Sequence, residues 1–408
     1  MILTREKKEV WNLFEKISFR FLFLYFTLYI FSLFTATLWE PIINWIGTSI
    51  FKIDYDFSSN GKGSGDTTYA YLLLFLFFWL SVLISIIWSF LDKKRKSYNQ
   101  LQYGFLITIR VILIFFMFQY GIIKVFHLQM SELSNAELIK TLGNKSPMGL
   151  AWTFMGFSKT YSAFAGLSEV IAGLLLISRR TQTFGAIATV AVMLNVFMMN
   201  LCFDIPVKIF SFHLMLMGAV ILMADFKRIF GVFIRNKNIG NYTLYPQLKK
   251  GDRIIIIIAK WVLLFLISAF FIFTSYPRYK KRYINPKTSL YGIWEITNFK
   301  HYNKPKNNKK DWKYIAIDNS KYASIKTIED KQAYVKFKVD TLKNTITFGG
   351  YNAKELDTLI YKRKDSTLLI KGILKKDSIV INLTRKNRAD FLLNSRGFNW
   401  INEYPLNK

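Results

Sequence analysis

Seven apolar stretches, each long enough to cross a lipid bilayer as a helix, occupy the first two thirds of the sequence. A transmembrane helix needs roughly 20 mostly apolar residues, because the hydrocarbon core of a bilayer is about 30 Å thick. Hydrophobic residues make up 52% of the chain, more than one soluble core can bury. The sequence therefore predicts a polytopic α-helical membrane protein with spans at 17–38, 69–91, 105–126, 161–178, 183–201, 206–223 and 254–274.

Basic residues gather in alternate loops between these stretches. Lysine and arginine are retained on the cytoplasmic side of a membrane, so alternate basic loops fix the orientation of the spans. The pattern predicts a cytoplasmic N-terminus and a C-terminal domain on the outer side of the membrane. The residues concerned are Arg5, Lys7, Lys8, Lys16, Lys93, Lys94, Arg95, Lys96, Arg179, Arg180, Lys227, Arg228, Arg235, Lys237, Lys249, Lys250 and Arg253.

The same residues account for much of the formal net charge of +30. Such a charge is also found in nucleic-acid-binding proteins, but here the basic residues before position 255 flank apolar spans and meet anionic headgroups. We expect the lipid bilayer as a partner and no nucleic acid. Because Cys202 is the single cysteine, the chain can form no intramolecular disulfide, CxxC redox pair or thiolate metal cluster, and we expect no metal site.

The composition changes after Thr274 from apolar to lysine-rich. Short runs there alternate between apolar and polar residues, a period that is typical of strands, at 290–299, 312–317, 333–339, 344–348, 357–361, 367–373 and 378–383. Seven or eight short strands predict a small antiparallel barrel or sandwich. The chain thus divides into a two-span segment at 1–104, a four-span bundle with its cytoplasmic loop at 105–253, a seventh span and neck at 254–286, and a β-rich domain at 287–408.

The first predicted strand opens with Gly292-Ile293-Trp294. This tripeptide is similar to the Gly-x-Trp opening of lipocalin-like barrels. The resemblance implies that Trp294 closes one end of a barrel and packs under a late arginine, a role that Arg396 could take. A buried tryptophan on a first strand is the simpler alternative.

Ionisable and amide side chains lie within or beside the third to sixth apolar stretches. A charge at the centre of a span costs about 2.5–3.5 kcal/mol or more, so it needs a partner, water or a function. Glu169 falls midway along the fourth stretch, and Arg110 and Lys124 share one face of the third. The candidates for ligand binding or proton relay are Arg110, Lys124, Glu169, Asn195, Asn200, Asp204, Lys208 and His213.

With the predicted topology, all of these candidates except Arg110 lie at mid-depth to outer depth. If the four helices form one bundle, the side chains converge on a polar site that opens toward the outer face. Interhelical hydrogen bonds and side chains that extend to the membrane surface are the alternative, which stays open for Lys124 and Lys208. For Glu169 the apolar surroundings favour a function. His213 alone is more typical of a packing residue, although His127 and His213 together could hold a haem.

Several short motifs within 105–225 resemble the DoxX-like membrane proteins, and the long form with a C-terminal strand-rich domain resembles DoxX-like proteins of Bacteroidetes. The motifs are Arg110, Gln119-Tyr120-Gly121-Ile122-Ile123-Lys124, Ser146-Pro147, Trp152-Thr153-Phe154-Met155-Gly156, Tyr161, Gly166, Glu169, Gly173, Arg179-Arg180, Asn195, Asn200, Asp204, Pro206-Val207-Lys208 and His213. The resemblance implies a four-helix bundle. Together with the charge pattern it also implies a bacterial inner membrane, with the N-terminus in the cytoplasm and the C-terminal domain in the periplasm. It also implies a link to redox or detoxification complexes, because the named member of the family is a subunit of a thiosulfate:quinone oxidoreductase.

Two functions follow as expectations. The first is an accessory or binding role, in which the bundle holds a quinone or lipid at the outward-facing polar site and the barrel binds a ligand or partner. The second is a membrane subunit of a quinone-linked oxidoreductase, with Glu169 or His213 moving protons. The second requires a redox or envelope protein partner, because the chain carries no cofactor motif of its own. A transporter would favour inverted repeats, which we do not find.

Overall fold

The computed structural model describes residues 10–53, 64–236, 250–302 and 311–407. The chain divides into two compact units. The helical unit comprises Met1–Gln129 and Ala163–Ser275, and the barrel unit comprises Met130–Ser162 and Tyr276–Lys408.

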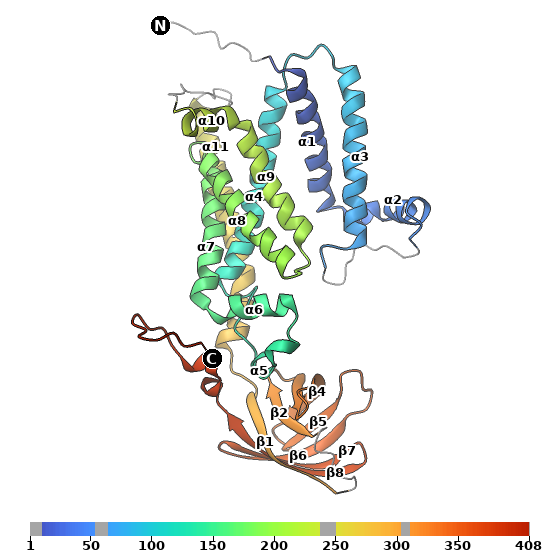
Figure 1. The fold of residues 1–408 in the computed structure, drawn as a ribbon, viewed down its shortest axis with the longest axis vertical. Coiled ribbons are helices and arrows are strands. Elements are labelled where there is room, and N and C mark those ends of the chain that lie inside the picture. Colours follow the sequence, from blue (N-terminus) through green and yellow to red (C-terminus); the bar gives the residue numbers. More distant parts are fainter. Residues whose placement is uncertain (1–9, 54–63, 237–249, 303–310, 408) are drawn as a thin grey trace. The chain divides into compact units, whose positions relative to one another are not determined.

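The helical unit confirms the polytopic character of the chain (Figure 1). Within the described residues, five helices are long and apolar enough to cross a membrane, and the number rises to seven if each of two bent helix pairs counts as one span. The protein is therefore a membrane protein by its helices. The α-helices described in this unit are α1 (Leu13–Ser32), α2 (Glu40–Trp45), α3 (Thr68–Leu91), α4 (Asn99–Val125), α7 (Lys159–Ile177), α8 (Gln182–Cys202), α9 (Lys208–Ala224), α10 (Phe226–Phe233) and α11 (Lys250–Tyr279).

The first span departs from its predicted end at residue 38. Helix α1 begins where Asn12 and Glu15 form a reciprocal capping box, and it ends at Ser32. The segment that follows turns away by 113°. The hydroxyls of Ser32 and Thr35 donate to the backbone carbonyls of Tyr29 and Phe31, at 2.7 and 2.8 Å. Such side-chain hydrogen bonds compete with the backbone hydrogen bonds of a helix and bend it. The length of the apolar run in the sequence does not reveal this bend.

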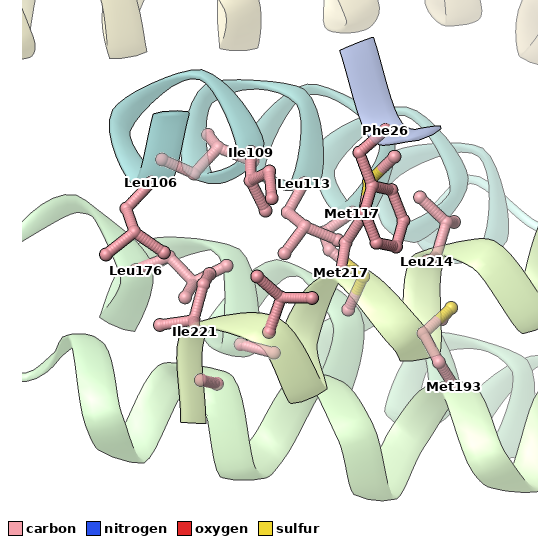
Figure 2. Close-up of a cluster of buried hydrophobic side chains, with 14 of the residues drawn as sticks. Phe26, Leu106, Ile109, Leu113, Met117, Leu176, Met193, Leu214, Met217 and Ile221 are labelled. Carbon is pink, nitrogen blue, oxygen red and sulfur yellow. The ribbon is translucent and has the colours of Figure 1, made fainter. Parts of the chain in front are cut away.

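The core of the helical unit is built around α4 (Figure 2). In the most apolar 18-residue stretch of α4, 44% is buried, whereas the corresponding value for α11 is 6%. Helix α4 is therefore central, and α11 lies at the periphery of this unit. Figure 2 shows side chains of α1, α7, α8 and α9 directed toward those of α4. The labelled members of the cluster are Phe26, Leu106, Ile109, Leu113, Met117, Leu176, Met193, Leu214, Met217 and Ile221.

The C-terminal part forms a closed barrel of eight antiparallel strands in sequence order, which confirms the predicted architecture (Figure 1). Alternate residues point inward, as Ile379, Ile381 and Leu383 do on the last strand. An eight-stranded barrel is just wide enough for side chains to fill its interior. The strands are β1 (Gly292–His301), β2 (Trp312–Ile317), β3 (Tyr322–Thr327), β4 (Gln332–Asp340), β5 (Thr345–Gly350), β6 (Asp357–Lys364), β7 (Thr367–Leu374) and β8 (Asp377–Lys386).

Segment Met130–Ser162, placed in the four-span bundle by the sequence, belongs instead to the barrel unit. It contains α5 (Asn135–Leu138) and α6 (Pro147–Phe157). The backbone N–H groups of Asn135 and Ala136 donate to the Asp318 carboxylate at 2.7 and 3.0 Å, which caps the start of α5. Arg388 donates to the Asn135 side chain at 2.9 Å. These contacts join residues more than 180 positions apart, so no local pattern indicates them.

Trp294 is 1% exposed and donates from its indole nitrogen to the carbonyl of Leu290 at 2.9 Å. The prediction that Arg396 packs on Trp294 is wrong. Arg396 is exposed and donates to Asn402, whereas the guanidinium over the Trp294 ring, at 5.9 Å from its centroid, is that of Arg363. Arg363 lies on β6 and also donates to the Ser289 carbonyl at 2.6 Å, so its place over Trp294 follows from the fold of the barrel and not from distance along the sequence.

Candidate functional site

Lys124 of α4 and Glu169 of α7 form a buried ion pair. The Lys124 ammonium donates to Oε1 of Glu169, and the two side chains are 5% and 1% exposed. Paired charges of this kind offset the large penalty that either charge alone would carry in an apolar interior. Of the candidates predicted from sequence, these two meet directly across a helix interface.

Two glycines bring the helices together at this point. Gly121 precedes Lys124 by three residues, and Gly166 precedes Glu169 by three, so each glycine lies on the same helix face as its charged neighbour. A Cβ atom on Gly121 would lie 2.7 Å from the Gly166 carbonyl oxygen, and one on Gly166 would lie 2.5 Å from the Gly121 oxygen. No side chain fits in that space. Small residues of this kind let transmembrane helices approach closely.

The second carboxylate oxygen of Glu169, Oε2, is buried and has no hydrogen-bond partner among the described residues. Buried carboxylate oxygens normally accept hydrogen bonds, and an unsatisfied one costs about 1–3 kcal/mol or more when charged. A water or the polar head of a ligand would satisfy this oxygen. The arrangement thus offers a cationic donor, Lys124, and an acceptor, Glu169 Oε2, side by side in an apolar bundle.

Lys208 and Asp204 form a second pair, at 2.9 Å. Asp204 is largely exposed, so this contact lies at the surface of the helical unit. The backbone N–H groups of Lys208 and Ile209 donate at 2.8 and 3.0 Å to Asp66, which caps the start of α9. The sequence analysis did not single out Asp66, which ties the segment before α3 to the start of α9.

His213 has both ring nitrogens in protein hydrogen bonds. Nδ1 donates to the Ile209 carbonyl at 2.7 Å, so Nε2 accepts from the Tyr25 hydroxyl, also at 2.7 Å. The ring stacks on Tyr29 with centroids 3.9 Å apart. Both ring nitrogens of His213 therefore have protein partners, and the side chain links α9 to α1.

The two asparagines of α8 lie in different environments. Asn200 is buried and donates to the Ser211 hydroxyl at 2.9 Å, which ties α8 to α9. Asn195 is exposed on the outside of the helical unit, so it does not join the other candidates.

Arg110 caps the C-terminal end of α7. Its guanidinium donates to the carbonyl oxygens of Leu176 and Ile177, at 2.9 Å from Nε and 2.9 Å from Nη2 respectively. Cations at helix C-termini satisfy carbonyls that have no helical partner. Lys260 of α11, which the sequence analysis did not single out, donates to the same Ile177 oxygen at 3.2 Å.

The eight candidates therefore do not form one site. The Lys124–Glu169 pair is buried between α4 and α7, Asp204–Lys208 is a surface pair, Asn200 and His213 make interhelical hydrogen bonds, Arg110 is a helix cap, and Asn195 is exposed.

The barrel unit contains a polar cluster that the sequence analysis did not identify. His301 donates from Nδ1 to Asp377 at 2.5 Å and from Nε2 to Asp311 at 3.0 Å. Burial alone would lower the pKa of His301, but the hydrogen bonds to the two carboxylates outweigh it and hold the pKa above 6.5. When the ring is protonated, both nitrogens donate and His301 forms an ion triplet with the two carboxylates, in which His301 of β1 and Asp377 of β8 link the two strands. Among the described residues, no cluster of three or more His, Cys, Asp or Glu is arranged to hold a metal ion.

No model of a protein family matches the chain, and no solved structure matches it. The chain is similar to an uncharacterized protein, YwoB, of Bacillus subtilis (strain 168), with 36% identity over 126 residues. The matched region covers 80% of YwoB and 31% of the present chain. At this identity and coverage the two proteins share a common fold and ancestry over the matched region. The chain therefore belongs to the family of YwoB.

Proposed function

We propose that this is a DoxX-like membrane protein of accessory function, whose helical unit binds the polar head of a quinone or lipid at the Lys124–Glu169 pair. The observation that carries the proposal is the buried, unsatisfied Oε2 of Glu169 beside the Lys124 ammonium. A quinone carbonyl or a lipid ester oxygen accepts from an ammonium, and a quinol or lipid hydroxyl donates to a carboxylate. The residues present thus fit both classes of ligand.

We also propose that the membrane is a bacterial inner membrane, with the N-terminus cytoplasmic and the barrel unit periplasmic. The alternate basic loops support this orientation. Labelling with a membrane-impermeant maleimide tests it, because the chain has one native cysteine, Cys202. In a Cys202→Ser background, a cysteine at Lys94 should be protected in intact cells and one at Lys375 should be labelled.

The barrel unit acts, in this proposal, as a docking module for an envelope or redox protein partner. Its interior is filled by apolar side chains of all eight strands, among them Phe337 and Ile381, which favours binding through the outer surface over ligand storage inside.

A retention assay tests the ligand site. The protein is extracted in mild detergent, and bound quinones and lipids are identified by mass spectrometry for the wild type and for the double variant Lys124→Met/Glu169→Met. The double variant keeps apolar volume at the pair and removes both charges, so we expect the fold to persist and the ligand to be lost. Asn195→Leu is the matched control, because it removes an exposed amide from the same unit. Undiminished retention by the double variant would refute the site.

A further inference from the structure

The segment at 396–406, near the end of the chain, exposes its large apolar side chains. Phe398 and Trp400 are 78% and 90% exposed, and Ile401 and Tyr404 are 79% and 85% exposed. Figure 1 shows this segment extending beyond the strands of the barrel. Single exposed apolar residues are normal on a protein surface, but a contiguous group of large ones marks an interaction site.

Contacts within the segment hold these side chains in place. The Arg396 guanidinium donates to the side-chain oxygen of Asn402, and the Asn402 amide donates to the Asn399 carbonyl at 3.2 Å. The rings of Phe398 and Trp400 meet edge to face, with their centroids 5.0 Å apart. Polar side chains of the segment thus bind within the segment itself, and the two rings form a small aromatic cluster that is exposed.

The residue types of the segment are those of a membrane interface. Tryptophan and tyrosine combine an apolar ring with a polar N–H or O–H group, and they are enriched at the depth of the lipid headgroups. Trp400 and Tyr404 supply these rings, and the neighbouring phenylalanine and isoleucine add apolar surface. The two charged residues of 396–406, Arg396 and Glu403, carry opposite charges, so no net charge favours or opposes the approach to a neutral bilayer.

The bilayer that the helices cross is within reach of this segment. Strand β1 begins at Gly292, soon after α11 ends at Tyr279, so the barrel unit is tethered to the membrane by a short connection. A second contact made by a tethered unit is intramolecular, which raises its effective concentration and lets a weak insertion suffice. A second copy of the chain is a poorer match, because the described strands close into a barrel and leave no edge to which an extended segment could add.

We propose that residues 396–406 insert into the interfacial region of the lipid bilayer, on whichever side of the membrane the barrel unit lies. The rings of Phe398 and Trp400 then lie among the lipid headgroups. The segment is a second membrane anchor of the chain, and it restricts the rotation of the barrel about its tether. This inference is independent of the ligand site proposed at Lys124–Glu169.

A fluorescence assay on the full-length protein in phosphatidylcholine vesicles tests the proposal. In a Cys202→Ser background, the variant Ile401→Cys carries an environment-sensitive fluorophore, and Lys343→Cys, in the exposed turn after β4, is the control. We expect a nitroxide phosphatidylcholine to quench the fluorophore at position 401 roughly two-fold or more, and iodide on both sides of the membrane to quench the one at position 343 instead. Iodide quenching at position 401 equal to that at position 343, without an effect of the nitroxide lipid, would overturn the proposal.

The double variant Phe398→Ser/Trp400→Ser removes the aromatic cluster. Because both side chains are exposed, the circular dichroism spectrum should be unchanged, and position 401 should lose its quenching by the nitroxide lipid and become open to iodide. Lipid quenching that persists in this variant would refute the anchoring role of the two rings. A much lower ratio of protein to lipid should leave the result for the wild-type segment unchanged, whereas protection from iodide that is lost on dilution would overturn the proposal in favour of a second copy of the chain.

Discussion

Replacing Lys124 by methionine leaves the Glu169 carboxylate buried without its cation. Both side chains are almost fully enclosed, at 5% and 1% exposure, so solvent cannot screen the remaining charge. Breaking a buried pair by removing one partner costs about 3–5 kcal/mol. Replacing both partners by apolar residues of similar volume is often neutral or stabilising. We therefore expect Lys124→Met and Glu169→Met each to cost about 3–5 kcal/mol, and the double variant to cost less than either single one.

The assay is reversible unfolding in mixed micelles of mild detergent and sodium dodecyl sulfate, followed by circular dichroism for the wild type, both single variants and the double variant. The pair Glu15–Lys227 provides the control cycle, because it belongs to the same unit, has its charged atoms 3.4 Å apart and is exposed. We expect a coupling energy of about 0.2–1 kcal/mol for that control. If the free energy of unfolding lost by the double Lys124/Glu169 variant equals the sum of the losses in the two single variants, the charges do not act as a buried pair and the account of the interface fails.

Three further predictions concern the surroundings of the site and the barrel. Gly166→Ala places a Cβ atom 2.5 Å from the Gly121 oxygen and should destabilise the helical unit by about 1–3 kcal/mol, whereas Gly104→Ala, with no atom within 4 Å, should be neutral or stabilising in the same unfolding assay. Asp66→Ala removes the cap of α9 and should cost about 0.5–2 kcal/mol, while Asp204→Ala at the exposed pair should change the free energy of unfolding by less than about 0.5 kcal/mol. The pKa of His301 is raised, so the protonated ring stabilises the barrel below the ordinary histidine pKa for as long as Asp311 and Asp377 stay ionised, and this stabilisation is lost as the pH rises through the folded-state pKa of His301. NMR titration of the ring protons should give a pKa above 6.5, and a value at or below 6.5 would refute the ion triplet.

The sequence was sufficient to predict the long elements. Spans such as 69–91 and 183–201 follow from the length of an apolar run alone, and they agree with α3 and α8 within two residues. Most strands were predictable because one face of each packs inward and the other meets solvent, which produces alternation. Strand β3 was missed because four of its six residues in succession, including Ser324 and Lys326, are buried. The Lys326 ammonium donates to the Ile139 carbonyl at 2.8 Å, so segment Met130–Ser162 covers a face that would otherwise be exposed.

The contacts of the candidate site were only partly predictable. Glu169 and Lys124 stood out because charges are costly within apolar spans, but their direct pairing depends on the close approach at Gly121 and Gly166. His213 attracted attention for the same reason and proved to be satisfied by Tyr25 and Ile209, which no spacing rule indicates. Which polar groups meet across helices depends on the rotation of each helix about its axis, and packing, not local sequence, determines that rotation.

Photo-crosslinking tests the central claim most directly. The wild-type protein in native-like membranes is exposed to an azido-quinone and, separately, to a photoreactive phospholipid, and the labelled peptides are mapped. The account predicts that one of the two probes labels α4 near Lys124 and α7 near Glu169, and that Lys124→Met/Glu169→Met abolishes this labelling. Labelling that avoids both helices, or that persists in the double variant, would contradict the claim that the buried pair holds a ligand.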